Sequence, residues 1–198
     1  MSPPIDPDEK VPTTVARSDH ACFGCGDQNP IELHLHFEPV GDGVEALFVP
    51  RSEHQGFEDV IHGGIVSTVL DEAMAWATAR AGLWAVTGEM RVRFRLPLRV
   101  GERTSVTARV TGFRNKVVTT TAELTRVDDR ARIATASATF VKVSADVEAA
   151  RRARYLHDEK VASGGALIPP MSGAGAELEE SRLCLSCDDV DVGDPPEV

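Results

Sequence analysis

The segment from residue 63 to about residue 80 constrains the fold most strongly, because its apolar residues recur at helical spacing on most of its sides. The recurring positions are Ile65, Val66, Val69, Leu70, Ala73, Met74 and Ala77. Spacings of three and four residues are typical of an α-helix, and so wide an apolar surface predicts a helix that is buried on most sides. Ala81-Gly82 supplies the end of this helix, with Gly82 at the C′ position.

The residues around this helix alternate between apolar and polar, as β-strands do. The alternation predicts strands over residues 33–37, 44–49, 90–96, 104–110, 117–124 and 131–143. Glycine positions predict a hairpin turn over residues 41–43 and another turn near Gly112, and residues 50–61 are expected to be a loop. This order predicts an α+β fold, in which an antiparallel sheet of about six strands wraps around one long central helix.

The two ends of the chain differ in composition from this central part. Residues 1–19 contain four prolines among charged residues, and residues 163–198 are rich in glycine, proline and acids. Such compositions are typical of disorder. The sequence therefore predicts one folded domain over residues 20–144, a candidate C-terminal helix over residues 145–162, and disordered segments over residues 1–19 and 163–198.

The charge distribution argues against a nucleic-acid partner, and the length of the apolar runs argues against a membrane span. Residues 171–198 carry −7 of the net charge of −10, which leaves the rest of the chain nearly neutral and without a broad basic surface for nucleic acid. No apolar run reaches the roughly 18 residues of a membrane helix. The polar, proline-rich first twenty residues are not typical of a secretory signal. We therefore expect a cytoplasmic protein with no nucleic-acid partner and no membrane span.

The four cysteines form two Cys-x-x-Cys pairs, Cys22/Cys25 and Cys184/Cys187. In a cytoplasmic protein, such pairs are typical of zinc binding or of redox chemistry. One four-cysteine metal site would join the two pairs. The alternative, which we favour, is that Cys22 and Cys25 are small residues packed near a turn, that the tail thiols are free, and that there is no metal.

The start of the long helix carries the residues that most suggest chemistry. His62-Gly63-Gly64 opens the helix, and Asp71 and Glu72 follow in its apolar run. Glycines let the backbone approach a ligand closely, and free N–H groups at a helix N-terminus attract a negatively charged or polarised oxygen. A carboxylate in an apolar helix is costly to bury and needs a role. Together these features suggest acyl transfer, with an oxyanion site and an acid or base.

Four motifs spread over residues 22–143 resemble those of one protein family. They are Cys22-x-x-Cys25-Gly26 with Asn29-Pro30; His54-Gln55-Gly56 followed by His62-Gly63-Gly64; Leu70-Asp71-Glu72-Ala73-Met74; and Val86-Thr87-Gly88-Glu89 leading into Val92-Arg93-Phe94-Arg95 and Pro97. The chain thereby resembles the hotdog-fold thioesterases, specifically the phenylacetyl-CoA-type (PaaI-like) branch of the 4-hydroxybenzoyl-CoA thioesterase superfamily. The most specific motif is the His-Gly-Gly with a carboxylate nine residues beyond the histidine.

This resemblance implies hydrolysis of acyl-CoA thioesters to free acid and CoA, without a cofactor, by a homodimer or homotetramer. It implies that Asp71 is the catalytic carboxylate, as general base or nucleophile, and that the Gly63 N–H polarises the thioester carbonyl. It further implies substrate-site roles for Thr87, Gly64 and Gln55. Gln55 stands one residue from the position at which many relatives carry Asn or Gln.

The spacing of the two main catalytic candidates makes a prediction of its own. Asp71 lies eight residues after Gly63, which is about 12 Å along a helix axis. An acid or base and an oxyanion donor must both come within about 3 Å of the reacting group. If both act, Asp71 of one subunit must serve the site around Gly63 of a second subunit. We therefore expect a homo-oligomer whose sites are shared between subunits.

Several assignments stay open at this point. His62 is a candidate base, although we favour a role in ordering the turn before the helix. Glu72 points about 100° away from Asp71 around the helix and is interpreted as structural or as part of an interface. Arg114 and Lys116 are candidates for binding CoA phosphates, and so is a set of arginines on one strand face, Arg91, Arg93 and Arg95. A non-catalytic acyl-CoA-binding module on the same fold is the alternative function.

Overall fold

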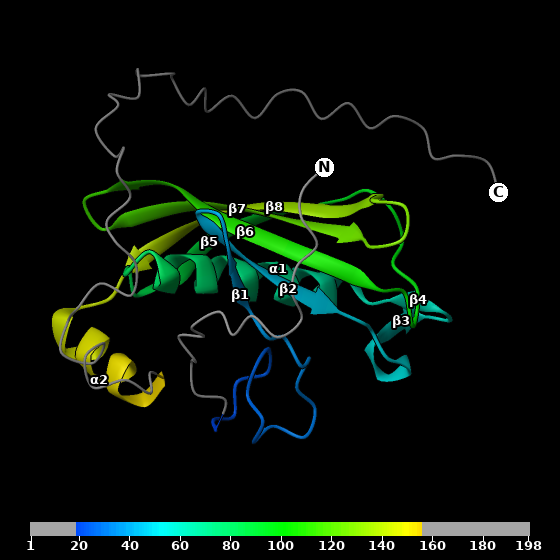
Figure 1. Cartoon of the computed structure of the whole chain (residues 1–198), viewed down its shortest axis with the longest axis horizontal. Helices are drawn as coiled ribbons and strands as arrows, with labels where there is room; N and C mark the ends of the chain where they lie inside the picture. The colour runs from blue at the N-terminus through cyan, green and yellow to red at the C-terminus, as the bar shows by residue number, and fades with distance from the viewer. Residues whose placement is uncertain (1–18, 156–198) are drawn as a thin grey trace, which may run out of the picture.

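The computed structural model describes residues 19–155, in which one antiparallel sheet wraps around one long helix (Figure 1). In chain order the elements are β1 (Glu38–Val40), β2 (Gly43–Phe48), the short 3-10 helix η1 (Ser52–His54), β3 (Gln55–Phe57), β4 (Val60–Ile61), α1 (Gly63–Arg80), β5 (Ala85–Phe94), β6 (Thr104–Arg114), β7 (Val117–Arg126), β8 (Arg132–Lys142) and α2 (Ala145–Tyr155). The expected α+β arrangement, with its antiparallel sheet and central helix, is confirmed.

The main sheet has six strands in the order β1-β2-β6-β7-β8-β5, and every neighbouring pair is antiparallel. One edge strand, β1, is only three residues long. The other edge strand, β5, has ten residues and pairs on one side only, with β8. The hairpin of β3 and β4 forms a separate two-stranded sheet. The sheet therefore leaves one long edge without a partner in the described chain.

Helix α1 packs against β2, β5, β6, β7 and β8, and its predicted boundaries are confirmed. Its buried residues are Val66, Val69, Leu70, Ala73, Met74, Ala77 and Thr78. A fully buried side chain of the size of Leu70 or Met74 stabilises the fold by about 1.5–3 kcal/mol. The helix ends at Arg80 with Ala81 as its C-cap, and Gly82 follows with a φ of +74°, which is the left-handed conformation that favours glycine. No helix in residues 19–155 is both long and apolar enough to cross a membrane.

Residues 19–37, the N-terminal loop, cover the side of α1 that faces away from the sheet (blue in Figure 1). The expected strand over residues 33–37 is wrong. Leu33 and Leu35 are buried, but their N–H groups donate to carbonyls of the same loop, and His34 between them has a φ of +56°. The alternation of apolar residues therefore reflects burial against α1 and not pairing in the sheet.

The expected turn near Gly112 is also wrong. Strand β6 continues to Arg114, and the turn to β7 is made by Asn115 and Lys116. Asn115 has a φ of +59°, a conformation that asparagine tolerates better than most residues. Gly112 instead lies at a shift in the β6–β7 register, opposite Thr119. The expected loop over residues 50–61 contains η1 and the β3–β4 hairpin.

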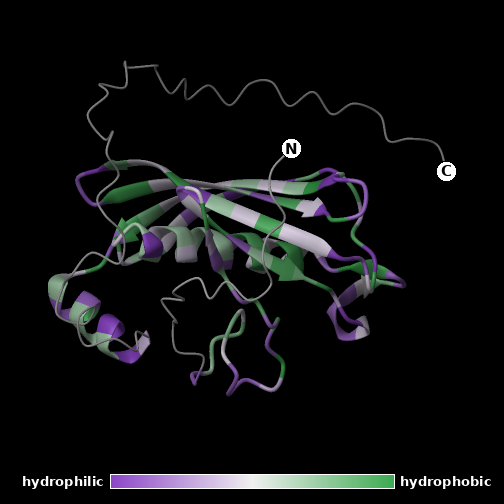
Figure 2. Ribbon diagram, viewed as in Figure 1, coloured by the Kyte–Doolittle hydropathy of each residue, from purple (hydrophilic) through white to green (hydrophobic). Residues whose placement is uncertain are grey.

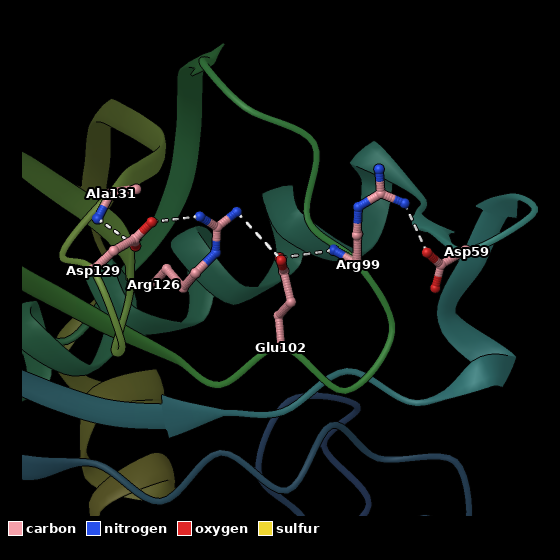
Figure 3. A network of polar contacts seen from close by, with 6 residues as sticks. All are labelled: Asp59, Arg99, Glu102, Arg126, Asp129 and Ala131. Atoms are coloured by element: carbon pink, nitrogen blue, oxygen red, sulfur yellow. Dashed lines mark hydrogen bonds and ion pairs between the residues drawn. The ribbon is translucent and has the colours of Figure 1, made fainter.

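A network of ion pairs links three connections of the fold: the β3–β4 turn, the segment between β5 and β6, and the β7–β8 turn (Figure 3). Glu102 accepts hydrogen bonds from the Arg99 backbone N–H at 3.0 Å and from the Arg126 guanidinium, which also pairs with Asp129 at 2.8 Å. The Arg99 guanidinium pairs with Asp59 at 2.7 Å. Each exposed pair contributes only about 0–1 kcal/mol. The network matters more for position, since Asp59 lies in the turn that leads into β4 and α1.

Helix α2 lies at one end of the molecule and contacts both the N-terminal loop and the segment before β5. Its last residue, Tyr155, places its ring 4.8 Å from the ring of His20 and 6.3 Å from that of Trp84. Arg154 donates a hydrogen bond of 2.6 Å to the Asp19 carbonyl. Figure 2 shows many hydrophilic residues along α2, which has no fully buried side chain. The remainder of the candidate helix over residues 145–162 and the two segments expected to be disordered lie almost entirely outside the described residues.

Candidate functional site

The turn before α1 leaves one backbone N–H free. His62 caps the helix, because its Nδ1 accepts a hydrogen bond of 2.9 Å from the Gly64 N–H. The Gly63 N–H has no acceptor among residues 19–155. Gly63 is therefore the donor at this helix N-terminus that remains available to a ligand, whereas the Gly64 N–H is occupied. The observed contact of His62 is the ordering of the turn; proton transfer by His62 stays a prediction.

His54 supports this turn from the β3–β4 side. The His62 N–H donates to the His54 carbonyl at 2.8 Å, and the His54 Nδ1 accepts a hydrogen bond of 3.1 Å from the Arg51 N–H. The His54 ring is buried and stacks on Phe48 with centroids 5.9 Å apart. Burial lowers the pKa of His54, and the nearby positive charge of Arg51 lowers it further. The folded protein therefore favours a neutral His54.

We expect acidification to destabilise the fold in part through this histidine. Because the folded-state pKa lies below the ordinary value of 6.5, the unfolded chain binds the proton first, and stability present above about pH 6.5 is lost as the pH falls. A His54→Gln variant keeps an acceptor for Arg51 but does not titrate. Urea denaturation of both proteins from pH 8 to pH 5 should show the wild type losing free energy of unfolding relative to the variant. Parallel pH profiles would contradict this prediction.

Gln55, a predicted substrate contact, lies in β3 next to this turn. Its Nε2 donates to the Ser52 carbonyl at 2.8 Å, and its Oε1 accepts from the Asp59 N–H at 2.6 Å. Both ends of the amide are therefore used to shape the β3–β4 hairpin. A role of Gln55 in binding substrate stays a prediction.

The structure brings Asp71 and Thr87 together. The Thr87 hydroxyl, on the exposed edge strand β5, donates to Asp71 Oδ1 at 2.7 Å. The second carboxylate oxygen of Asp71 has no hydrogen-bond partner among residues 19–155. The side chain is thus held in one orientation while one oxygen stays open to water or a ligand.

Gly63 and Asp71 lie near opposite ends of β5 and do not form one site within a chain. A Cβ atom built on Gly63 would lie 3.4 Å from the ring of Phe94, the last residue of β5. Asp71 instead contacts Thr87, near the first residue of the strand. Val86 and Phe94 on this strand are 43% and 54% exposed, which leaves apolar surface uncovered at both ends.

The predicted phosphate contacts lie at the same end of the sheet as Thr87. Arg114 ends β6, and Lys116 follows in the turn to β7; both are exposed. The strand register runs from Arg114 to Val117, then to Val141 and to Val86 in β5. The row ends at Val86, the neighbour of Thr87, so the β6–β7 turn lies at nearly the same height in the sheet as Thr87. Within the described residues, neither Arg114 nor Lys116 contacts Asp71 or Gly63.

A second polar cluster, which the sequence did not predict, lies on the other side of α1. Glu72 Oε1 accepts hydrogen bonds from the Cys25 thiol at 2.9 Å, from the Cys22 thiol at 3.5 Å and from the Trp76 indole N–H at 3.2 Å. The expectation that Glu72 points away from Asp71 agrees with these contacts. The motif Cys22-x-x-Cys25 and a carboxylate in an apolar helix were both visible in the sequence, but nothing in it connected them.

These three acidic groups shift one another's pKa. Burial raises the pKa of Glu72 to about 7. The pKa of Cys22 is lowered to about 5, chiefly by the hydrogen bond with the Cys25 thiol and also by the backbone N–H groups of Cys25 and Gly24, although burial opposes them. The pKa of Cys25 is raised by the same contact with Cys22 and by burial. The three groups therefore share their protons through close contacts in a largely buried place.

A cavity of about 520 Å³ adjoins this second cluster. It lies between the N-terminal loop, α1 and α2, and its lining includes Glu72, Trp76, Trp84 and Tyr155. Gly63, Asp71 and Thr87 are not among the lining residues. The cavity and the Asp71 site therefore lie on different faces of α1.

Comparison with known sequences identifies one matching family. A family model for the thioesterase superfamily matches residues 58–133, a range that includes Gly63, Asp71 and Thr87. A comparison with curated proteins gives no match.

Several solved structures share the fold. A thioesterase superfamily protein aligns with a TM-score of 0.54 and 19% identity over 57% of this chain, which spans only 55% of that protein. The PaaI protein of the E. coli phenylacetic acid degradation operon aligns with a TM-score of 0.52 and 19% identity, covering 56% of this chain and 84% of PaaI. A hypothetical thioesterase from Streptococcus pneumoniae TIGR4, solved with coenzyme A, gives 0.52 and 14% identity, covering 56% and 86%. The hotdog fold and the similarity to PaaI-like thioesterases are thereby confirmed.

Proposed function

We propose that this hotdog-fold chain, similar to thioesterases of the PaaI type, hydrolyses acyl-CoA thioesters to a free acid and CoA. The observation that carries the proposal is the Asp71 carboxylate, which Thr87 orients at the edge of the sheet while one of its oxygens stays open. The free Gly63 N–H at the start of the same helix is the proposed oxyanion donor. The coenzyme A in the related S. pneumoniae structure supports a CoA ester as the substrate class.

The Gly63 N–H would stabilise the negative charge that develops on the thioester oxygen. It lies at the first turn of α1, where the helix dipole also favours negative charge. Loss of one such oxyanion donor typically costs about 10²–10³ in rate. This role requires the carbonyl oxygen to approach the backbone closely, which a glycine allows.

Asp71 would act in one of two roles, as general base or as nucleophile. As general base, it takes a proton from water while the water oxygen bonds to the carbonyl carbon, and the tetrahedral intermediate then expels the CoA thiolate. As nucleophile, its open oxygen attacks the carbonyl carbon, the C–S bond breaks and the CoA thiolate leaves, and water then hydrolyses the resulting anhydride to the free acid and the Asp71 carboxylate. In both reactions Thr87 is a positioning residue, since it holds the other oxygen of the carboxylate.

A pairing of two β5 strands would complete the site. A long, unpaired edge strand is a template for pairing with another chain. If two copies of β5 pair antiparallel about a two-fold axis between Met90 and Arg91, Thr87 of one copy lies opposite Phe94 of the partner subunit. Within each chain, Asp71 contacts Thr87 and Gly63 lies beside Phe94. The pairing would bring Asp71 of one copy towards Gly63 of the partner subunit, so that each dimer contains two shared sites.

Arg114 and Lys116 would bind the CoA phosphates. Both cations are exposed beside a turn, and guanidinium and ammonium groups are the usual partners of phosphate oxygens. The exposed side chains of Val86 and Phe94, near the two ends of β5, agree with a site that a second subunit closes.

Turnover of an acyl-CoA panel tests the proposal. Short, medium, long and aromatic acyl-CoAs are incubated with the protein, and released CoA is separated by chromatography, because the cysteines of this chain would react with thiol reagents. We expect release above the enzyme-free rate for at least one acyl class. Calorimetric binding of acyl-CoA without turnover of any panel member would contradict hydrolysis and favour a non-catalytic acyl-CoA-binding module.

A further inference from the structure

The side chains of Cys22, Cys25 and Glu72 converge on one point from two elements. Their ligand atoms, two sulfurs and a carboxylate oxygen, all lie within 4.8 Å of one another. The cysteines come from the N-terminal loop, and Glu72 comes from the middle of α1. Cys25 is buried, and Cys22 is partly buried. Residues 47 and 50 positions apart in sequence thus meet in an enclosed place.

The spacing of these atoms suits a tetrahedral metal ion. Zinc binds thiolate sulfur at about 2.3 Å and carboxylate oxygen at about 2.1 Å, so a sulfur and an oxygen on one ion lie about 3.6 Å apart. The observed distances from Glu72 Oε1 are 3.5 Å to the Cys22 sulfur and 2.9 Å to the Cys25 sulfur. An ion would therefore require only a small outward shift of Cys25.

The backbone of the loop is shaped around the same atoms. The Gly24 N–H donates to the Cys22 sulfur at 3.4 Å, a contact that favours a thiolate. A Cβ atom at Gly24 would lie 2.7 Å from the Glu72 carboxylate carbon. The loop therefore closes over Glu72 at a distance that only glycine allows without displacing the carboxylate.

No cation contacts these groups among the residues that the structure describes. Their hydrogen-bond partners are one another, the backbone N–H groups of Gly24 and Cys25, and the Trp76 indole. A Cys22–Cys25 disulfide would remove both thiol donors and leave the Glu72 oxygen with Trp76 alone. One divalent ion would instead replace the two thiol protons and bind all three groups, which is how buried charges of one sign are usually compensated.

We propose that Cys22, Cys25 and Glu72 bind one divalent metal ion of the zinc class, which fastens the N-terminal loop to α1. Two thiolates and one carboxylate are a ligand set that zinc accepts. The fourth position opens towards the cavity of about 520 Å³ and takes water. Binding releases the thiol protons to solvent. The ion lies on a different face of α1 from Asp71, about 100° around the helix, and takes no part in the proposed hydrolysis.

Metal content and cobalt spectroscopy test this site in the full-length protein. Zinc is measured by mass spectrometry after purification under reducing conditions. Reduced, metal-free protein is then titrated with Co²⁺, which gives a near-ultraviolet band when thiolates bind it. The variants are Cys22→Ala and Glu72→Gln, and the matched control is the tail double variant Cys184→Ala/Cys187→Ala. The tail variant keeps the proposed site intact even if a loop variant fails to fold.

We expect one metal ion per chain in the wild type and in the tail variant, with the thiolate band in both. Loss of a group that only supports a metal ligand typically weakens metal binding by about 10–100-fold. Cys22→Ala and Glu72→Gln each remove a ligand, so each should weaken zinc binding by more than this. Loss of the ion in the tail variant would overturn the proposal in favour of a site that uses the tail cysteines. Absence of binding in the reduced wild type would also overturn it, and a Cys22–Cys25 disulfide in that preparation would indicate a redox pair instead.

Discussion

The Asp71→Ala variant is expected to lose acyl-CoA turnover by about 10²–10⁴ while it stays folded, since this is the usual cost of removing a general base. Loss of a nucleophile would have an effect at least as large. Alanine removes the oxygen that is open to water together with the one that Thr87 holds. The fold should tolerate the change, because the side chain is only partly buried at the edge of the sheet. Steady-state release of CoA and thermal melting of the same samples measure the two properties separately.

Three further variants sharpen this test. Asp71→Asn keeps the size of the side chain and an acceptor for the Thr87 hydroxyl, so its activity should fall nearly as far. Thr87→Val removes only the positioning contact and should reduce turnover less than either change at Asp71. Asp128→Asn, in the exposed turn between β7 and β8, is the matched control and should leave turnover unchanged. Near wild-type turnover of Asp71→Ala would remove Asp71 from the mechanism.

The second large effect is the recovery of activity when two inactive variants are combined. Gly63→Leu places a branched side chain beside the Phe94 ring, in the proposed path of the thioester oxygen, and we expect it to inactivate the enzyme as Asp71→Ala does. In a heterodimer of the two variants, one shared site contains both defects and the other contains none. Such a heterodimer should recover up to about half of the wild-type activity per dimer.

The heterodimer is obtained by co-expression of the two variants with different affinity tags and two-step purification. Each variant purified alone provides the inactive reference. If Gly63 and Asp71 served one reaction within a single chain, each subunit would keep one defect. A well-folded but inactive heterodimer would therefore exclude shared sites. Because Gly63 and Asp71 lie near opposite ends of β5 and cannot act together within one chain, that result would also separate the two residues in the mechanism.

The long helix and its surroundings could be predicted from the sequence because both signals are local. Apolar residues at helical spacing fix α1, and Gly82 fixes its end. The alternation of the later strands predicts the sheet. Strand β6 extends four residues beyond its expected end, because Gly112 lies at a shift in the β6–β7 register and not in a turn. Asparagine at position 115, the residue that takes the left-handed conformation, was the better local signal for this turn.

The N-terminal loop and its cysteines could not be predicted, because their structure depends on contacts distant in sequence. Leu33 and Leu35 alternate as strand residues do, but what they cover is a helix that begins some thirty residues later. Glu72 is costly to bury, which the sequence already indicated. That its partners are Cys22 and Cys25 follows only from the path of the loop across α1.

The unpaired edge of β5 also affects how the chain folds in a crowded cell. If two copies of β5 pair as proposed, a newly made monomer exposes ten residues of strand edge until it meets a second copy, and such an edge is a site for aggregation. Arg91, Arg93 and Arg95 are all exposed along this segment. Their repeated positive charge opposes stacking with unrelated strands and so acts as a gatekeeper. These arginines would thus protect the subunit during the interval between synthesis and assembly.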